Sequence, residues 1–172
     1  QALLGHSAGI ICVVYSPDGT KIATADSSGV IKLWDQASGQ ELWSVVGHAE
    51  SVRSLGMSSN GNWLVSGGND RCVHLWSVAS GELLQTFKGH SNWVTNVYFN
   101  AESSSITSIA NDGLLKEWEP TTGMALSSRR LRNEGEFFRY VLSHDGAYLL
   151  QWSNGSGLTL VDAQTRRPLH QL

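Results

Sequence analysis

Histidine, serine and aspartate recur in this chain at spacings that would suit hydrolytic chemistry. Two sets share one spacing: His48, Ser66 and Asp70, then His90, Ser108 and Asp112. In serine hydrolases an aspartate orients a histidine, which activates a serine nucleophile. Here the arrangement repeats, and neither set has a nucleophile elbow or a glycine-rich oxyanion turn beside it. The repetition favours a structural role, so we expect no catalytic residue and no enzyme activity.

The six histidines could also be metal ligands. Three of them follow a glycine at a constant spacing, which places them too far apart to share one ion. Of the others, His74 lies in an alternating run where we expect an exposed position, His144 replaces proline in a turn, and His170 lies in an outer run. The sequence has no P-loop, dinucleotide-binding, Cys-x-x-Cys or calcium-loop motif. We therefore expect neither a metal nor a cofactor.

The chain repeats itself every 42 residues. The markers are Gly5-His6, Gly47-His48 and Gly89-His90, and Trp34, Trp76 and Trp118. A fourth copy, from about residue 131 to residue 162, has lost most of them. A period of this length indicates one supersecondary unit that is built several times, because a single unit cannot bury its own apolar faces.

Each copy contains four apolar runs, which alternate or are rich in β-branched and aromatic residues. Turn residues separate these runs at intervals too short for helices. In the first copy we expect strands at Ile10–Tyr15, Lys21–Ala25, Val30–Asp35 and Glu41–Val46. The turn at residues 100–105 of the third copy lacks the glycine found in the others, so it fits the pattern least well.

The pattern resembles the WD40 repeat family of β-propellers, over nearly all of the chain. In that family a histidine, a Ser or Thr, an Asp and a Trp form a hydrogen-bonded tetrad within each blade. The resemblance implies two complete tetrads: His48, Ser66, Asp70 and Trp76, and His90, Ser108, Asp112 and Trp118. Such a row would satisfy buried polar groups.

The first and fourth copies depart from the tetrad pattern. The first has His6, Thr24 and Trp34, with Ser28 where the Asp should be. Asp26 is an alternative, although its offset of two residues can aim it elsewhere. The fourth has Arg132 in place of the histidine, Gln151 in place of Ser or Thr, and no Trp at the site equivalent to Trp118, where Leu160 or Val161 falls. We assign it as a blade from its strands and turns alone.

We therefore expect an all-β, WD40-type propeller segment with four blades of four antiparallel strands, forming one domain over residues 1–172. The expected blades are residues 5–46, 47–88, 89–130 and 131–172. Propellers of this family commonly close with about seven blades. The missing blades would come from a longer chain or from a second copy; a closed ring of four is the remaining alternative.

The resemblance also implies a binding surface, the top face, where the family binds peptides and proteins. The positions that map to it are Gly9, Ile11, Ser27, Ser51, Arg53, Asn69, Trp93, Thr95, Asn111, Glu136 and Phe138. We favour Trp93 and Arg53, because Trp and Arg dominate interface hot spots. The alternatives are that Trp93 packs between blades and that Arg53 is a solvated charge. The run Arg129-Arg130-Leu131-Arg132 is expected in a top loop, as a phosphate-binding or a solvated cluster.

The composition is that of a folded β domain, with 41% hydrophobic and 16% charged residues. A net charge of −3 makes a nucleic-acid or anionic-membrane partner an improbable one. No apolar stretch approaches the ~18 residues that a membrane span needs. Cys12 and Cys72 are expected to be reduced, as in an intracellular protein of the cytoplasm or nucleus.

Three functions follow as hypotheses. The first is a non-catalytic scaffold that binds a protein or peptide on the top face, as part of a larger assembly. The second is a reader of phosphorylated or acidic motifs that uses the arginines. The third is a regulatory segment of an enzyme whose catalytic domain lies outside these residues.

Overall fold

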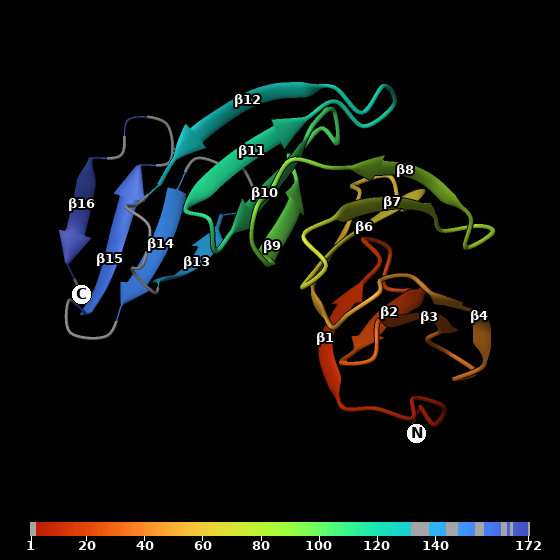
Figure 1. Ribbon diagram of the computed structural model, residues 1–172. Helices are drawn as coiled ribbons and strands as arrows, with labels where there is room; N and C mark the ends of the chain where they lie inside the picture. The colour runs from red at the N-terminus through yellow and green to blue at the C-terminus, as the bar shows by residue number, and fades with distance from the viewer. Residues whose placement is uncertain are drawn as a thin grey trace.

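The computed structural model describes residues 3–131, 138–143, 148–153, 157–162, 165 and 167–171. All sixteen elements are β-strands, and they form four antiparallel sheets of four strands each. Within each sheet the strands are neighbours in chain order. The expected fold class is confirmed. The sheets stand one after another along an arc, with the N-terminal and C-terminal blades at its two ends (Figure 1).

The strands of each blade run from the innermost to the outermost. Blade 1 contains β1 (Ile10–Tyr15), β2 (Lys21–Asp26), β3 (Val30–Asp35) and β4 (Glu41–Val46). Blade 2 contains β5 (Val52–Met57), β6 (Trp63–Gly68), β7 (Val73–Ser77) and β8 (Leu83–Phe87). Blade 3 contains β9 (Val94–Phe99), β10 (Ile106–Ala110), β11 (Leu114–Trp118) and β12 (Ala125–Arg130). Blade 4 contains β13 (Phe138–Leu142), β14 (Tyr148–Ser153), β15 (Gly157–Asp162) and β16 (Pro168–Gln171).

The turn of blade 3 that lacks glycine still forms. Ser103 occupies the position of Gly19 and Gly61 in the other blades and adopts the same left-handed conformation, with φ of 56°. Its hydroxyl is buried and accepts a hydrogen bond from the backbone N–H of Ser59, at 2.8 Å, in the neighbouring blade. This bond between blades offsets the strain that a serine side chain incurs at positive φ.

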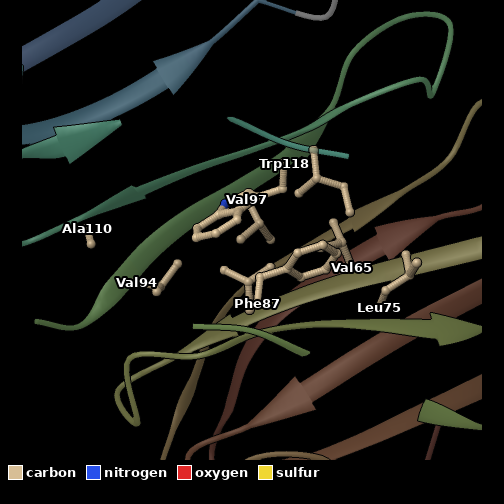
Figure 2. Close-up of a cluster of buried hydrophobic side chains, with 9 residues drawn as sticks. Val65, Leu75, Phe87, Val94, Val97, Ala110 and Trp118 are labelled. Atoms are coloured by element: carbon tan, nitrogen blue, oxygen red, sulfur yellow. The ribbon is translucent and has the colours of Figure 1, made fainter. Parts of the chain in front are cut away.

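The apolar core lies between adjacent blades. Phe87 at the end of β8 packs against Trp118 of β11, with ring centroids 5.6 Å apart. Figure 2 shows these two rings with Val97 and Val65 in one cluster that blades 2 and 3 build together. A second cluster joins blades 1 and 2 in the same way. Adjacent blades therefore bury their facing sides against each other, as the repeat period predicts.

Both cysteines are free and half-buried. Burial raises the pKa of the Cys12 thiol to about 12, so Cys12 is an unreactive packing residue. In the part of the chain that the structure describes, no helix is long and apolar enough to cross a membrane.

Candidate functional site

The antiparallel ladders give each blade two ends. We call the top face the end at which the inner strands begin, where Val52 of β5 lies opposite Gly68 of β6. At the other end, the bottom face, Met57 of β5 lies opposite Leu64 of β6. The turns that carry Asp26, Asp70 and Asp112 all lie on the top face.

The two complete tetrads form the hydrogen-bonded rows that the resemblance implies. In blade 2, Nδ1 of His48 lies 2.9 Å from the Asp70 carboxylate, and Nε2 lies 2.7 Å from the Ser66 hydroxyl. The Trp76 indole N–H donates to the same hydroxyl at 2.8 Å.

Blade 3 repeats this geometry. His90 lies 2.9 Å from Asp112 and 2.8 Å from Ser108, and Trp118 donates to the Ser108 hydroxyl at 2.8 Å. The serine hydroxyl of each row is held by its own histidine and tryptophan, and it is fully buried in both blades. This is the geometry of a structural row rather than of an accessible nucleophile.

In blade 1 the tetrad uses Asp26, and the assignment of Ser28 to this position is wrong. His6 Nδ1 lies 2.7 Å from the Asp26 carboxylate, and Trp34 donates to the Thr24 hydroxyl at 2.8 Å. The exposed Ser28 instead donates to Asp26 through its hydroxyl, at 2.7 Å. Asp26 is fully buried at the end of β2, so the two-residue offset carries its carboxylate to the same histidine.

Each tetrad carboxylate is held in its ionised form. Burial alone would raise the pKa of Asp112, but hydrogen bonds from His90 and from the backbone N–H groups of Leu114 and Ser91 outweigh it, and the pKa lies below its ordinary value. The same balance lowers the pKa of Asp70 and of Asp26. These carboxylates therefore stabilise the folded state at neutral pH and lose that effect as the pH falls through their lowered pKa.

His74 is buried, and the expectation of an exposed position is wrong. It is 9% exposed, and its ring lies 4.4 Å from the ring of His48, centroid to centroid. Blades 1 and 3 have Lys32 and Lys116 at the same repeat position, where each ammonium lies over the tetrad tryptophan. The 42-residue alignment places these residues together, but it gives no sign that the histidine turns inward.

Among the described residues, His48, Asp70 and His74 are the one group whose ligand atoms are close enough to hold a metal ion together, within 4.8 Å of one another. Both ring nitrogens of His48 are already engaged, by Asp70 and Ser66, and Nδ1 of His74 lies 3.0 Å from the Thr86 hydroxyl. An ion would have to break the tetrad. The arrangement is therefore better suited to packing than to metal binding.

His74 gives the fold a specific pH dependence. Burial, and then the nearby His48, lower the pKa of His74 to about 4 from its ordinary 6.5. Between these two values the unfolded chain binds up to one more proton than the folded chain, so stability falls as the pH drops from 6.5 to 4.

The variant His74→Lys takes the residue of the equivalent positions and does not titrate in this range. We expect its melting temperature, followed by circular dichroism, to fall less between pH 6.5 and 4.5 than that of the wild-type chain. An identical decrease in both proteins would contradict this assignment.

The top face is shaped by a bulge at the same place in three blades. The ladder of β5 and β6 shifts register between Val52 and Ser54, which leaves Arg53 as the extra residue. Equivalent shifts leave Ile11 of β1 and Thr95 of β9 as the extra residues of blades 1 and 3. Bulges redirect a side chain and are common beside functional sites.

Arg53 and Trp93 lie together on this face. The guanidinium of Arg53 lies 5.3 Å from the centroid of the Trp93 ring, and its Nε–H donates to Asn69 Oδ1 at 2.7 Å. Trp93 belongs to the loop that enters blade 3, so the pair spans two blades. We call Arg53, Asn69 and Trp93 the top-face cluster.

The other predicted top-face residues have more varied surroundings. Thr95 is half-buried and donates its hydroxyl to the Ile109 carbonyl, whereas Ile11 is 43% exposed. Ser51 and Trp93 accept, through their carbonyls, the backbone N–H of Asn69 and Asn111 respectively, both at 2.9 Å.

Some predicted positions lie in another element or outside the described residues. Arg129 and Arg130 are the last residues of strand β12 and not part of a loop, which corrects the expectation for that run. Glu136, Arg132 and the side chain of Phe138 lie outside what the structure describes.

Comparisons with known proteins agree with this architecture. The model of the WD domain, G-beta repeat family matches residues 1–35, 39–77 and 81–119. Small ribosomal subunit protein RACK1 of Medicago sativa is 44% identical over 45 residues, which are 26% of this chain and 14% of that protein.

Two solved structures share the fold at 20% sequence identity, the structure of U3-55K and the crystal structure of RRP9 WD40 repeats. Their TM-scores are 0.78 and 0.79, and each covers 98% of this chain. This chain spans 65% and 64% of their lengths. The three matched repeats cover more than half of the sequence, and each of them contains one of the three tetrads. The chain belongs to the WD40 repeat family.

Proposed function

We propose that this chain is a non-catalytic scaffold that binds a protein or peptide segment at the top-face cluster. The observation that carries the proposal is the cation–π contact between Arg53 and Trp93. Trp93 is 44% exposed although it is a large aromatic residue, and exposed aromatic and arginine residues are the types that dominate protein interfaces. The buried tetrads beneath the face supply a rigid frame.

The family membership supports the same general role. The RACK1 match is to a protein named as part of the small ribosomal subunit, so it agrees with a role in an assembly and with an intracellular location.

Selection of random peptides displayed on phage, with the whole chain as bait, tests the proposal. We expect selected peptides to bind the Trp93→Ala variant at least about tenfold more weakly than the wild-type chain, because loss of a hot-spot aromatic costs about 2 kcal/mol or more. Met124→Ala is the matched control, since Met124 is 66% exposed on the bottom face. Affinities that survive Trp93→Ala, or that fall equally with Met124→Ala, would overturn the proposal.

The four blades, at residues 5–46, 47–88, 89–130 and 131–172, are further proposed to be part of a larger ring of about seven blades. On β1, Cys12 and Val14 pack toward blade 2, whereas Val13 and Tyr15 point the other way and are 60% and 58% exposed. An apolar sheet face of this kind is normally covered. Further blades of a longer chain or a second copy of this one would cover it, and sedimentation equilibrium distinguishes the two.

A further inference from the structure

Exposed charges in the first three blades are separated by sign between the two faces. The exposed basic residues near the top face are Arg53, Arg71, Lys88 and Arg130. The only exposed acidic residue described there is Glu50. The bottom turns and strand ends instead carry the exposed acidic residues Asp18, Glu41, Glu82 and Glu102.

This separation decides the electrostatic character of the top face. The net charge of the chain is −3, which by itself would disfavour an acidic partner. Charges more than about 8 Å apart are largely screened at physiological ionic strength, so a bound segment responds to the local charges. With Arg53, Arg71 and Lys88 against Glu50 and the half-buried Asp70, the top of blade 2 is therefore a locally cationic surface on an acidic protein.

The geometry of Arg53 leaves one edge of its guanidinium for a ligand. A guanidinium has five N–H donors. The Nε–H donates to Asn69, and the guanidinium carbon lies over the Trp93 ring, 5.3 Å from its centroid. Among the residues that the structure describes, none accepts a hydrogen bond from the two Nη atoms, and no carboxylate forms an ion pair with Arg53.

A guanidinium restricted in this way is preorganised to bind a carboxylate. The two Nη groups form a fork that matches the two oxygens of a carboxylate. Because Asn69 and Trp93 already restrict the side chain, less conformational entropy is lost when a ligand binds. The exposed part of the Trp93 ring next to this fork offers an apolar surface.

We infer that the top-face cluster binds an acidic protein segment, with an Asp or Glu carboxylate on the Nη edge of Arg53 and an apolar side chain on Trp93. This inference rests on the proposed function and names the chemistry of its partner. Asn69 is a positioning residue, because it acts on the ligand through the Arg53 Nε–H.

Parallel peptide selections on charge variants of the whole chain test the inference. Random peptides are selected on the wild-type chain, on Arg53→Gln and on Arg53→Glu. We expect Asp and Glu to be enriched in the wild-type selection, to lose that enrichment with Arg53→Gln, and to be replaced by Lys and Arg with Arg53→Glu. Lys21→Glu, a charge reversal at the bottom of blade 1, should leave the wild-type preference unchanged.

A synthetic peptide from the wild-type selection provides the second measurement. Replacing its acidic residue by the amide should weaken binding about tenfold to the wild-type chain and leave binding to Arg53→Gln unchanged. Asn69→Ala should weaken binding of the acidic peptide while the amide peptide is unaffected. Melting curves verify that each variant is folded.

The outcomes separate this inference from the proposed function. Peptides that depend on Trp93 but show no acidic preference would overturn the inference and leave the scaffold in place. Peptides whose affinity is unchanged by Trp93→Ala would overturn both the inference and the proposed function. Binding that requires a phosphoserine in place of the Asp or Glu would also overturn the carboxylate assignment.

Discussion

Replacement of Asp112 by alanine is expected to lower the free energy of unfolding by about 3–5 kcal/mol, the cost of removing one partner from a buried polar pair. Asp112 is 5% exposed. Its carboxylate lies 2.9 Å from His90 Nδ1 and accepts the backbone N–H groups of Ser91 and Leu114, both at 2.9 Å. Alanine would leave these groups without an acceptor in a place that water reaches poorly. Chemical denaturation followed by tryptophan fluorescence measures the difference.

Asp35→Ala is the matched control for this prediction. Asp35 also accepts two hydrogen bonds, from the backbone and hydroxyl of Ser38 at 2.8 and 2.6 Å, but in an exposed turn. Water replaces the lost acceptor there, so we expect a decrease of about 1 kcal/mol or less. Asp112→Asn keeps one acceptor oxygen, so its loss in the free energy of unfolding should lie between those of Asp112→Ala and Asp35→Ala. Equal losses from Asp112→Ala and Asp35→Ala would show that the tetrad is not the source of stability.

Gly29→Ala is expected to destabilise the fold by about 2–5 kcal/mol, through backbone strain and a steric conflict together. Gly29 has φ of 90°, a conformation that side chains disfavour. An added Cβ would fall well inside the van der Waals contact distance of the His48 carbonyl oxygen and 3.0 Å from that of Glu50. The loop that enters blade 2 would have to move, and His48 belongs to a tetrad in that loop. Thermal and urea denaturation both report the loss.

Gly19 and Arg71 show how much of the destabilisation by Gly29→Ala comes from backbone conformation and how much from the steric conflict. Gly19 has φ of 71°, and nothing lies within 4 Å of a Cβ added there, so Gly19→Ala should cost about 1–2 kcal/mol from conformation alone. Arg71 occupies the position of Gly29 in blade 2, with φ of 69°. This fold therefore accepts a side chain at positive φ. If Gly29→Ala were no worse than Gly19→Ala, the close approach to His48 would not constrain the fold.

The tetrad also connects stability to the binding face. Asn69 immediately precedes the tetrad residue Asp70, and its Oδ1 accepts the Arg53 Nε–H. The hydrogen bond between His48 and Asp70 restricts the movement of the turn that contains both Asn69 and Asp70. We therefore expect changes in the blade 2 tetrad to loosen the top-face cluster as well as to lower stability.

Much of the fold could be predicted from the repeat. The alternating runs gave all four strands of blade 1, with one residue missed at Asp26, and the resemblance to the WD40 repeat implied both complete tetrads. These predictions succeed because they depend on contacts within a single repeat, where the same residue types recur at the same separation.

Other features depend on geometry that the spacing does not contain. The features in this group are the buried position of His74, the use of Asp26 in place of Ser28, and the cation–π contact between Arg53 and Trp93. The amino-acid sequence alone determined that repeated four-stranded units would form, because alternation and turn residues act locally. Only the tertiary structure decided which side chains meet across two blades and where each bulge directs its extra residue, because packing between sheets sets those contacts.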